Sequence, residues 1–427
     1  MEPLSDLSMP ISANARLFIW FRVLFNARFY YPIFTILFLD LGLSLGEFAA
    51  LNVVWAVTIV LLEVPSGALA DRYGRRPLVI AASVLMVLEM LVLCAMQPGQ
   101  PEVVFWLFVC NRILSGAAEA CASGADEALA YDSLPPAERT TLWPHVMAQL
   151  MRYSAVAVVF TSISGAWLYT QWTKWPVVLC LISALACLAV AWRMTESWLP
   201  PPKQSLWLSI GGTWRDILRT GAWIWHSNVA FALIVVGLVF DSLVRVFMTV
   251  NSNFYRLIGI EDAWFGVIGS ATALLGLLLA SSMKWATLRL GGVVNFVGLG
   301  ALLWLGLWGV AAARPGWWGV LGVVPLFVGM RFLHFFLSHY MNAIVPSEQR
   351  ATALSFRGLS MNLAYGGMTL LFGWHTAWLA HEMNLSAQDM AVFAQSLQWW
   401  PWFFMVMLLI TAGLLGWRHL KTKPMEA

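Results

Sequence analysis

The fold of this chain is decided by the stretch Glu63-Val-Pro-Ser-Gly67-Ala-Leu-Ala-Asp71-Arg72-Tyr-Gly74-Arg75-Arg76. An apolar run from about residue 48 to residue 70 leads into its charges, and a second run from about 77 to 96 follows them. Each run is long enough for a helix to cross the hydrocarbon core of a bilayer, which is about 30 Å thick. The stretch is therefore predicted to be a short basic hairpin between two membrane-spanning helices.

The spacing within this hairpin indicates a latch. Glu63, Gly67 and Asp71 are four residues apart, so they share one face of the first helix. A glycine on that face lets another helix approach closely. Asp71 stands where its helix should end, so its carboxylate opposes the helix dipole and needs a cation or another helix N-terminus. Such a hairpin, with Gly74 at its turn, can hold one helical bundle against another and release it.

The same stretch resembles the loop motif of the major facilitator superfamily, G-x-x-x-D-R-x-G-R-R. The matching residues are Gly67, Asp71, Arg72, Gly74, Arg75 and Arg76. The resemblance implies an all-α polytopic membrane protein with twelve transmembrane helices, arranged as two pseudo-symmetric six-helix bundles. It also implies that these residues form a conformational latch on the inner face, closed when the protein is open outward, and we expect Asp132 to join it as a partner of Arg75 or Arg76. The alternative is ordinary positive charge on the inner side of a membrane, with a glycine at the turn.

Composition independently places the chain in a membrane. Of its 427 residues 60% are hydrophobic and 11% charged, against about 25% charged residues in soluble domains. The net charge of +3 is too small to indicate nucleic acid as a partner. The five cysteines fall inside apolar runs without metal-ligand spacing, so we expect neither a disulfide framework nor a metal site, and no cofactor. The N-terminus lacks the basic region of a cleaved signal peptide.

Hydropathy divides the chain into twelve predicted spans. They cover residues 16–41, 46–70, 76–97, 102–131, 142–170, 174–195, 224–256, 262–284, 290–312, 316–343, 350–381 and 391–418. Between the sixth and seventh lies a segment with three consecutive prolines, followed by an amphipathic pattern that predicts a helix on the membrane surface. We therefore expect an N-terminal bundle over 1–195, a cytoplasmic linker over 196–223 and a C-terminal bundle over 224–427.

The distribution of Lys and Arg predicts the orientation. These residues concentrate in the loops on the side of both termini, whereas the loops on the other side hold only Lys174, Arg256 and Arg314. Because basic residues accumulate in cytoplasmic loops, both termini are predicted to be cytoplasmic. We expect a monomeric protein of the bacterial inner membrane.

The two halves repeat weakly. Gly42-Leu-Ser-Leu-Gly-Glu-Phe48 matches Gly259-Ile-Glu-Asp-Ala-Trp-Phe265 at its glycine and phenylalanine, and the same offset carries Gly74 onto Gly291. A second echo, at another offset, relates the loops after the fourth and tenth spans. Duplicated six-helix halves require inner loops at these places, although short matches in biased sequence can be accidental. In the second half Leu288 occupies the aspartate position of the loop motif, so the latch there is degenerate.

Ionisable residues inside a span are functional candidates by default. In the fourth span Arg112, Glu119 and Asp126 are spaced by seven, which predicts one polar stripe. Arg112-Ile-Leu-Ser-Gly116 resembles the superfamily's fourth-helix motif, whose arginine is linked to proton movement in several members. The run 123–134 resembles one found in many uncharacterised bacterial members. We expect Glu119 first, and Asp126 second, to carry a coupling proton. A static ion-pair network is the alternative.

Other spans add candidates. Glu63 either titrates in the cavity or anchors the latch. Asp241 is a coupling candidate, but Arg245, four residues on, can simply neutralise it. Arg28 lies off the face shared by Arg22 and Asn26. The remaining candidates, which we expect to line a substrate cavity, are Arg22, Asn26, Arg152, Arg331, His334 and Asn362.

The chain carries no phosphate loop, zinc spacing or nucleophile elbow, so we do not expect an enzyme. The resemblance implies a secondary transporter that moves a small molecule by alternating access. We predict a proton-coupled exporter of a small organic molecule. The fifth span offers only Ser164-Gly165-Ala166 in place of the exporters' Gly-Pro motif, which argues against drug–proton antiport. The alternatives are an uptake permease for an organic anion or metabolite, and a receptor or scaffold that keeps the fold without transporting.

Overall fold

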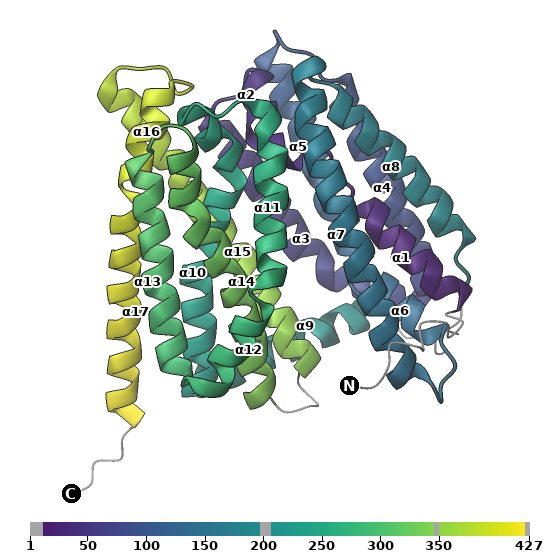
Figure 1. Cartoon of the computed structure of the whole chain (residues 1–427). Helices are drawn as coiled ribbons and strands as arrows, with labels where there is room; N and C mark the ends of the chain where they lie inside the picture. The colour runs from purple at the N-terminus through teal and green to yellow at the C-terminus, as the bar shows by residue number, and fades with distance from the viewer. Residues whose placement is uncertain (1–11, 197–205, 346–349, 423–427) are drawn as a thin grey trace, which may run out of the picture.

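The computed structural model describes residues 12–196, 206–345 and 350–422, and within them all regular structure is helical (Figure 1). The first half comprises α1 Ala13–Phe25, η1 Tyr31–Ile33, α2 Phe34–Asp40, α3 Leu45–Tyr73, α4 Arg75–Ala95, α5 Pro101–Ala122, α6 Ala125–Asp132, α7 Arg139–Gln171 and α8 Trp175–Arg193. The second half comprises α10 Asn228–Leu257, η2 Asp262–Trp264, α11 Phe265–Leu278, α12 Ala280–Arg289, α13 Gly292–Ala312, α14 Trp317–Ile344, α15 Arg350–Met383, α16 Met390–Gln398 and α17 Trp400–Thr422. Between the halves lies α9, Leu206–His226.

The helices fit the predicted twelve spans. In the described residues nine helical segments are long and apolar enough to cross a membrane, and the bent pair of α11 and α12 makes a tenth. The remaining predicted spans are α1 with α2, which is interrupted, and α15. We call the end where α9 lies and α17 ends the lower end, and the end that carries α2 and α16 the upper end (Figure 1).

Two predicted spans of the first half are broken rather than continuous. The span at 16–41 stops at Asn26, which caps α1, and resumes in η1, where Pro32 stands near the helix start. The span at 102–131 breaks at Ser123 and Gly124, and Gly124 has a φ of +74° that suits glycine. Prolines inside α3, α7 and α14 do not interrupt those helices.

The internal repeat is visible in the backbone. Gly42 and Gly259 both have positive φ, +100° and +78°. After each, the next amide donates to an equivalent carbonyl: Leu43 to Phe38 at 3.2 Å, and Ile260 to Tyr255 at 2.9 Å. Gly74 and Gly291 both precede a helix but differ in φ, +97° against −71°. Gly42 and Gly259 thus form the same turn, whereas Gly74 and Gly291 occupy equivalent positions with different backbone conformations.

The hydrogen bonds between the halves lie mainly toward the upper end. Thr35 and Ser252, which are related by the offset of the repeat, lie against each other, with the Thr35 amide donating to the Ser252 hydroxyl at 3.2 Å. The Gln388 side chain donates to the Gly42 carbonyl at 2.9 Å. A pseudo-two-fold axis therefore passes close to Thr35 and Ser252, where α2 meets α10.

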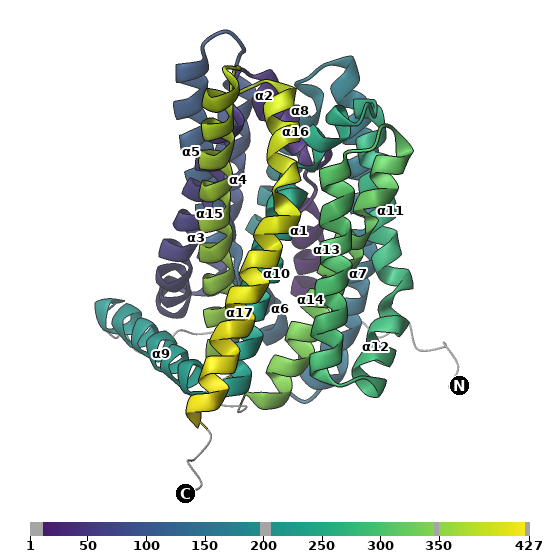
Figure 2. The same cartoon turned by 90° about the vertical axis from the view of Figure 1, so that its left-hand side faces the viewer.

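At the lower end, α9 crosses beneath both halves (Figure 2). Ile217 of α9 packs in one apolar cluster with Val64 of α3 and Leu359 of α15. α9 is a helix in the region where the sequence predicts one, and its place on the membrane surface stays a prediction. The three prolines before it lie outside the described residues.

Candidate functional site

The two helix breaks bring Arg22 and Asp126 together. Arg22 lies in the last turn of α1, and Asp126 in the first turn of α6, just past Gly124. Nε of Arg22 is 2.5 Å from Oδ2 of Asp126, and Nη2 donates to Oδ1 at 3.0 Å. The Asp126 side chain is fully buried, while that of Arg22 is 21% exposed. The pair therefore joins a protected carboxylate to a cation that solvent can reach.

The surroundings of this pair are open. Asn26, Ser123, Gly124 and Glu127 are exposed, and Glu127 lies 3.5 Å from Nη2 of Arg22. The Asn26 side chain donates to the Arg22 carbonyl, so this predicted cavity residue caps α1. The exposed polar groups gather at the two breaks, which makes this the best-formed candidate site in the first half.

A second buried cluster centres on Glu89 of α4, which the sequence analysis missed. Its carboxylate is fully buried and contacts Arg28 at 3.0 Å and Arg112 at 3.7 Å. Tyr30 donates its hydroxyl at 3.4 Å to Oε1, the oxygen that also faces Arg112. Two arginines thus share one carboxylate. The available signal was Glu89 itself, a lone carboxylate in an apolar run.

These contacts correct two expectations. Arg112, Glu119 and Asp126 do not form one network, because the break at Gly124 turns Asp126 toward Arg22 while Arg112 joins Glu89. Glu119, the first choice for proton coupling, is half-buried, and its side chain has no hydrogen bond or ion pair to any residue that the structure describes. Arg28, set aside on helical spacing, is buried in the Glu89 cluster, because α1 ends before it and that spacing no longer applies.

The second half holds its own charge cluster. Asp241 of α10 is fully buried and forms an ion pair with Arg245, as the neutralising interpretation predicted. Nε2 of His334 lies 3.3 Å from Oδ1 of Asp241, and Arg245 donates to the Asn362 side-chain oxygen at 3.0 Å. The Arg245 guanidinium also stands 5.2 Å over the Tyr365 ring. Three predicted candidates, Asp241, His334 and Asn362, therefore meet around Arg245.

Other candidates stand apart from both clusters. Arg152 of α7 is exposed and Arg331 of α14 is exposed, with its Nε beside Gly276 of α11. The Glu63 side chain is half-buried, and the Ser66 hydroxyl contacts its backbone carbonyl at 2.9 Å. Among the described residues no group of three His, Cys, Asp or Glu side chains could hold a metal ion.

The described contacts of the predicted latch include several within its own half. Arg75 forms an ion pair with Asp132 and donates to the Ala128 carbonyl at 2.9 Å. Arg76 donates to the Met194 carbonyl at 2.6 Å, beyond the end of α8. The side chain of Asp71 lies outside the described residues. The Arg72 guanidinium stands over Tyr73 at 5.3 Å. The described contacts of Arg75 and Arg76 thus brace α6 and the end of α8.

Gly74→Ala is expected to destabilise the folded protein by about 1–3 kcal/mol, because φ +97° and ψ 161° lie in a region that only glycine adopts readily. A Cβ there would also approach Oε2 of Glu196 to 2.6 Å, displacing it from the Arg76 amide. Thermal unfolding in detergent micelles measures this. The control is Gly67→Ala, since a Cβ at Gly67 meets nothing within 4 Å. An equal loss in both variants would show that backbone strain at Gly74 is not the cause.

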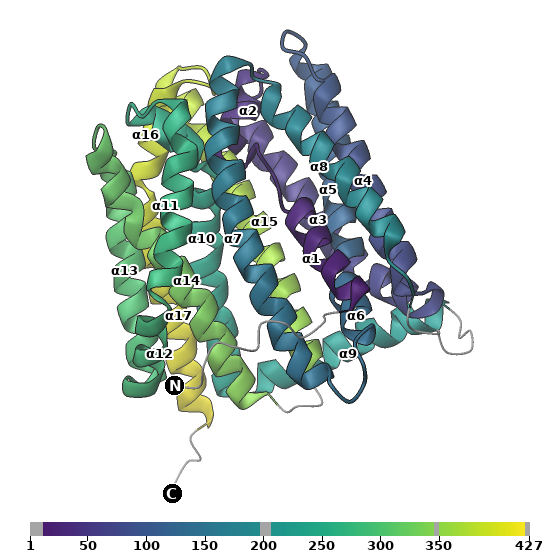
Figure 3. The ribbon, with the colours of Figure 1, turned by 45° about the vertical axis from the view of Figure 1, so that its right-hand side comes forward.

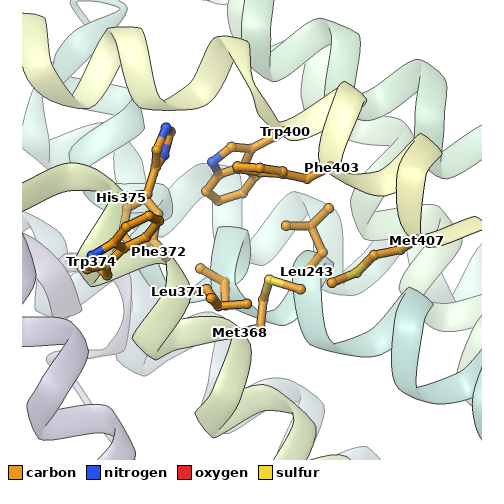
Figure 4. Close-up of a pocket in the computed structure, with 10 residues that line it drawn as sticks. Leu243, Met368, Leu371, Phe372, Trp374, His375, Trp400, Phe403 and Met407 are labelled. Carbon is orange, nitrogen blue, oxygen red and sulfur yellow. The ribbon is translucent and has the colours of Figure 1, made fainter. Parts of the chain in front are cut away.

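A cavity of about 120 Å³ lies in the second half, between α10, α15 and α17 (Figure 4). Its walls are apolar, with Trp400 and Phe403 on one side and Leu371 and Met368 on another. His375 is buried at its edge, and Phe403 packs 5.4 Å from the imidazole. The cavity is separate from the charged clusters.

The bundle of apolar spans has two halves that are related by an internal repeat, and it holds buried ion pairs beside helix breaks. These features are typical of a secondary membrane transporter. Sequence comparison agrees, because the profile of the Major Facilitator Superfamily matches residues 17–344. The chain belongs to this family. It is an integral membrane protein and a transporter, not an enzyme.

Solved structures share the fold at low identity. The nucleoside transporter NupG is 12% identical, with a TM-score of 0.66, over 94% of this chain and 99% of that one. A bacterial homologue of the human lysosomal transporter Spinster, in an inward-facing and unoccupied conformation, is 15% identical, with a TM-score of 0.69, over 97% and 98%. A POT family transporter in complex with 5-aminolevulinic acid is 14% identical, with a TM-score of 0.68, over 94% and 96%. Comparison with curated protein sequences found no significant match.

Proposed function

We propose that the chain exports a small organic molecule in exchange for protons, by alternating access, and that Asp126 carries the proton. The observation that supports this is the pair of Asp126 and Arg22 at the two helix breaks. A carboxylate fully removed from solvent favours its neutral form unless its cation stays in place. Since Arg22 is the partly exposed member of the pair, a substrate whose own donor replaces Arg22 on the ionised carboxylate would compete with the proton there. Substrate binding would then favour proton release from Asp126, and substrate departure would favour proton uptake, as exchange requires. Glu119, close to the same break, is the second proton carrier we propose.

We propose further that residues 1–195 and 224–427 are the rocking bundles, joined by the linker 196–223. The excess of Lys and Arg at the lower end supports placing that end in the cytoplasm, and we expect a monomer in the bacterial inner membrane. Hydrogen bonds between the halves concentrate toward the upper end, which supports loading of substrate from the lower end in this conformation. Arg245, with Asp241, His334 and Asn362, would form the facing wall of the site.

Asp126→Asn is expected to abolish substrate-dependent proton flux while substrate exchange across the membrane persists, because the amide cannot release a proton. Purified protein in liposomes with an internal pH-sensitive dye measures the flux under an imposed gradient. The panel of compounds begins with nucleosides and 5-aminolevulinic acid, named for structural neighbours, and adds amphipathic cations and organic anions.

The matched control is Glu127→Gln, which removes the adjacent, exposed carboxylate and should leave coupling intact. Coupled flux that survives in Asp126→Asn, and also when Glu119→Gln is added, would rule out both carboxylates as proton carriers. A lack of exchange with every compound, from folded protein, would instead favour the receptor or scaffold alternative.

Uptake of an organic anion is the second candidate, and the charge of Arg22 favours it. Protonation of Asp126 would leave Arg22 free to bind a carboxylate or phosphate, which couples proton and anion entry in one direction. The sign of the flux separates the two functions: protons and substrate move oppositely in export by exchange, and together in uptake.

A further inference from the structure

A long apolar groove runs along the seam between the halves on the outside of the bundle. It has a volume of about 690 Å³ and is lined by α7 from Ala155 to Trp167 and by Leu274 of α11. The one polar side chain in its wall, Ser164, donates to the Phe160 carbonyl at 2.6 Å and so offers the groove no free hydrogen. The groove therefore suits an apolar chain rather than a polar solute.

The groove faces lipid. Only 11% of the most apolar window of α7 is buried inside the protein, against 61% for α10. α7 and α11 lie side by side (Figure 3), and they touch closely where a Cβ at Gly266 would fall 1.9 Å from the Ser162 carbonyl. Phe160 and Trp167 stay largely exposed outside this contact, at 64% and 55%. The groove is thus a furrow in the membrane-facing surface, walled by both halves.

Arg152 marks one end of this furrow. The ridge of α7 that lines the groove carries Val156, Phe160, Ile163 and Trp167 at helical spacing, and Arg152 continues it one turn toward the lower end. Arg152 is exposed, and within the described parts of the chain no carboxylate or hydrogen-bond partner lies within reach of its guanidinium. An unpaired arginine on a lipid-facing ridge is costly unless an anion meets it.

The depth of Arg152 matches a lipid headgroup. Gln171, at the upper end of α7, is nineteen residues further on, about 28 Å along the helix, which is close to the thickness of the hydrocarbon core. Trp20 and Tyr153 stack at 5.7 Å beside Arg152 and are both exposed, as interfacial aromatic residues are. From Val156 to Trp167 the ridge measures about 16 Å, roughly the depth of one leaflet.

We propose that this groove binds one anionic phospholipid of the leaflet at the lower end, with its phosphate on Arg152 and an acyl chain along α7 toward Trp167. The planar guanidinium can donate to two phosphate oxygens at once. An anionic headgroup keeps a net negative charge to pair with Arg152, whereas in a zwitterionic headgroup the lipid's own positive group neutralises the phosphate. Since the lipid touches α7 and Leu274 of α11, it contacts both halves at once. Its binding would favour the present conformation, in which the spacing between α7 and α11 forms this groove.

Native mass spectrometry of the full-length protein with dioleoylphosphatidylglycerol or dioleoylphosphatidylcholine tests the site. Wild-type protein is expected to bind one phosphatidylglycerol roughly tenfold more tightly than phosphatidylcholine, and Arg152→Gln is expected to remove that preference. The matched control is Arg193→Gln, another exposed arginine at the lower end, in the last turn of α8, which should keep the preference.

A second variant tests the groove separately from the charge. Ile163→Trp fills the furrow and should weaken both lipids without changing their ratio. Equal loss of preference in Arg193→Gln would mean that the basic surface attracts anions generally, and an unchanged preference in Arg152→Gln would overturn the site. Retention of a second protein copy in place of lipid would overturn it as well. The unfolding temperature of each variant in detergent shows whether the protein remains folded.

Discussion

Glu89→Gln is expected to lower the free energy of unfolding by about 3–5 kcal/mol, the usual cost of removing one partner from a buried ion pair. Glu89 is fully buried, and it faces the Arg28 and Arg112 guanidiniums at 3.0 Å and 3.7 Å. The glutamine keeps the shape and part of the hydrogen bonding but leaves two buried positive charges. Thermal and denaturant unfolding in detergent micelles measures the loss.

Two further variants separate charge from packing. Glu102→Gln, at the exposed start of α5, removes a carboxylate without stranding a cation, so its unfolding should change by well under 1 kcal/mol. Adding Arg28→Gln to Glu89→Gln removes one stranded charge and should recover part of the stability. If the double variant is less stable than Glu89→Gln by the full effect of a second independent change, the two residues do not act as a pair.

Arg256→Gln is expected to shift the balance between conformations toward the one closed at the lower end. Arg256 of α10 holds Asp40 of α2, in the other half, at 2.6 Å and Asp262 at 2.7 Å. We call this group, with the Tyr169 hydroxyl that donates to Asp40 at 2.6 Å, the upper clasp. Its side chains are partly exposed, so losing it should cost about 1–2 kcal/mol, or roughly a five- to thirtyfold change in the ratio of conformations.

Spin-label distances between Thr141 of α7 and Ala343 of α14, both exposed at the lower end, report this balance. The distribution should move to shorter distances in Arg256→Gln, and in Asp40→Asn, which breaks the same contact from the other side. Arg314→Gln, an exposed arginine between α13 and α14, is the control and should leave it in place. Identical distributions in wild type and Arg256→Gln would mean that the upper clasp does not hold the halves in this conformation.

Much of the fold could be predicted from local pattern. Apolar run length identified the spans, and the matched glycines at Gly42 and Gly259 identified a real repeat, because a positive φ demands glycine at each turn. The ion pair of Arg75 with Asp132 followed from charge and topology together. The spans, the turns of the repeat and this ion pair could be predicted because they depend on local sequence and on the order of the spans along the chain.

The candidate site was harder to predict from the sequence, because helical spacing no longer predicts which residues share a face once a helix breaks. Past Asn26 and Gly124 the rotation from one side chain to the next is no longer the constant value of a helix. The directions of Arg28 and Asp126 therefore could not be predicted from their helical spacing. Glu89 escaped for another reason: its partners come from the first and fourth spans, and nothing within one turn of it on α4 is charged. Only tertiary packing reveals such a residue.

The partial exposure of the upper clasp makes the resting shape of the protein sensitive to ionic strength. Its carboxylates are 35% and 21% exposed, so mobile ions reach them directly. At about 0.15 M salt the screening length is about 8 Å, and at 1 M it is about 3 Å, comparable with the span of the clasp itself. The solution that bathes the upper end therefore sets part of the conformational balance, and concentrated salt there loosens the halves just as removal of Arg256 would.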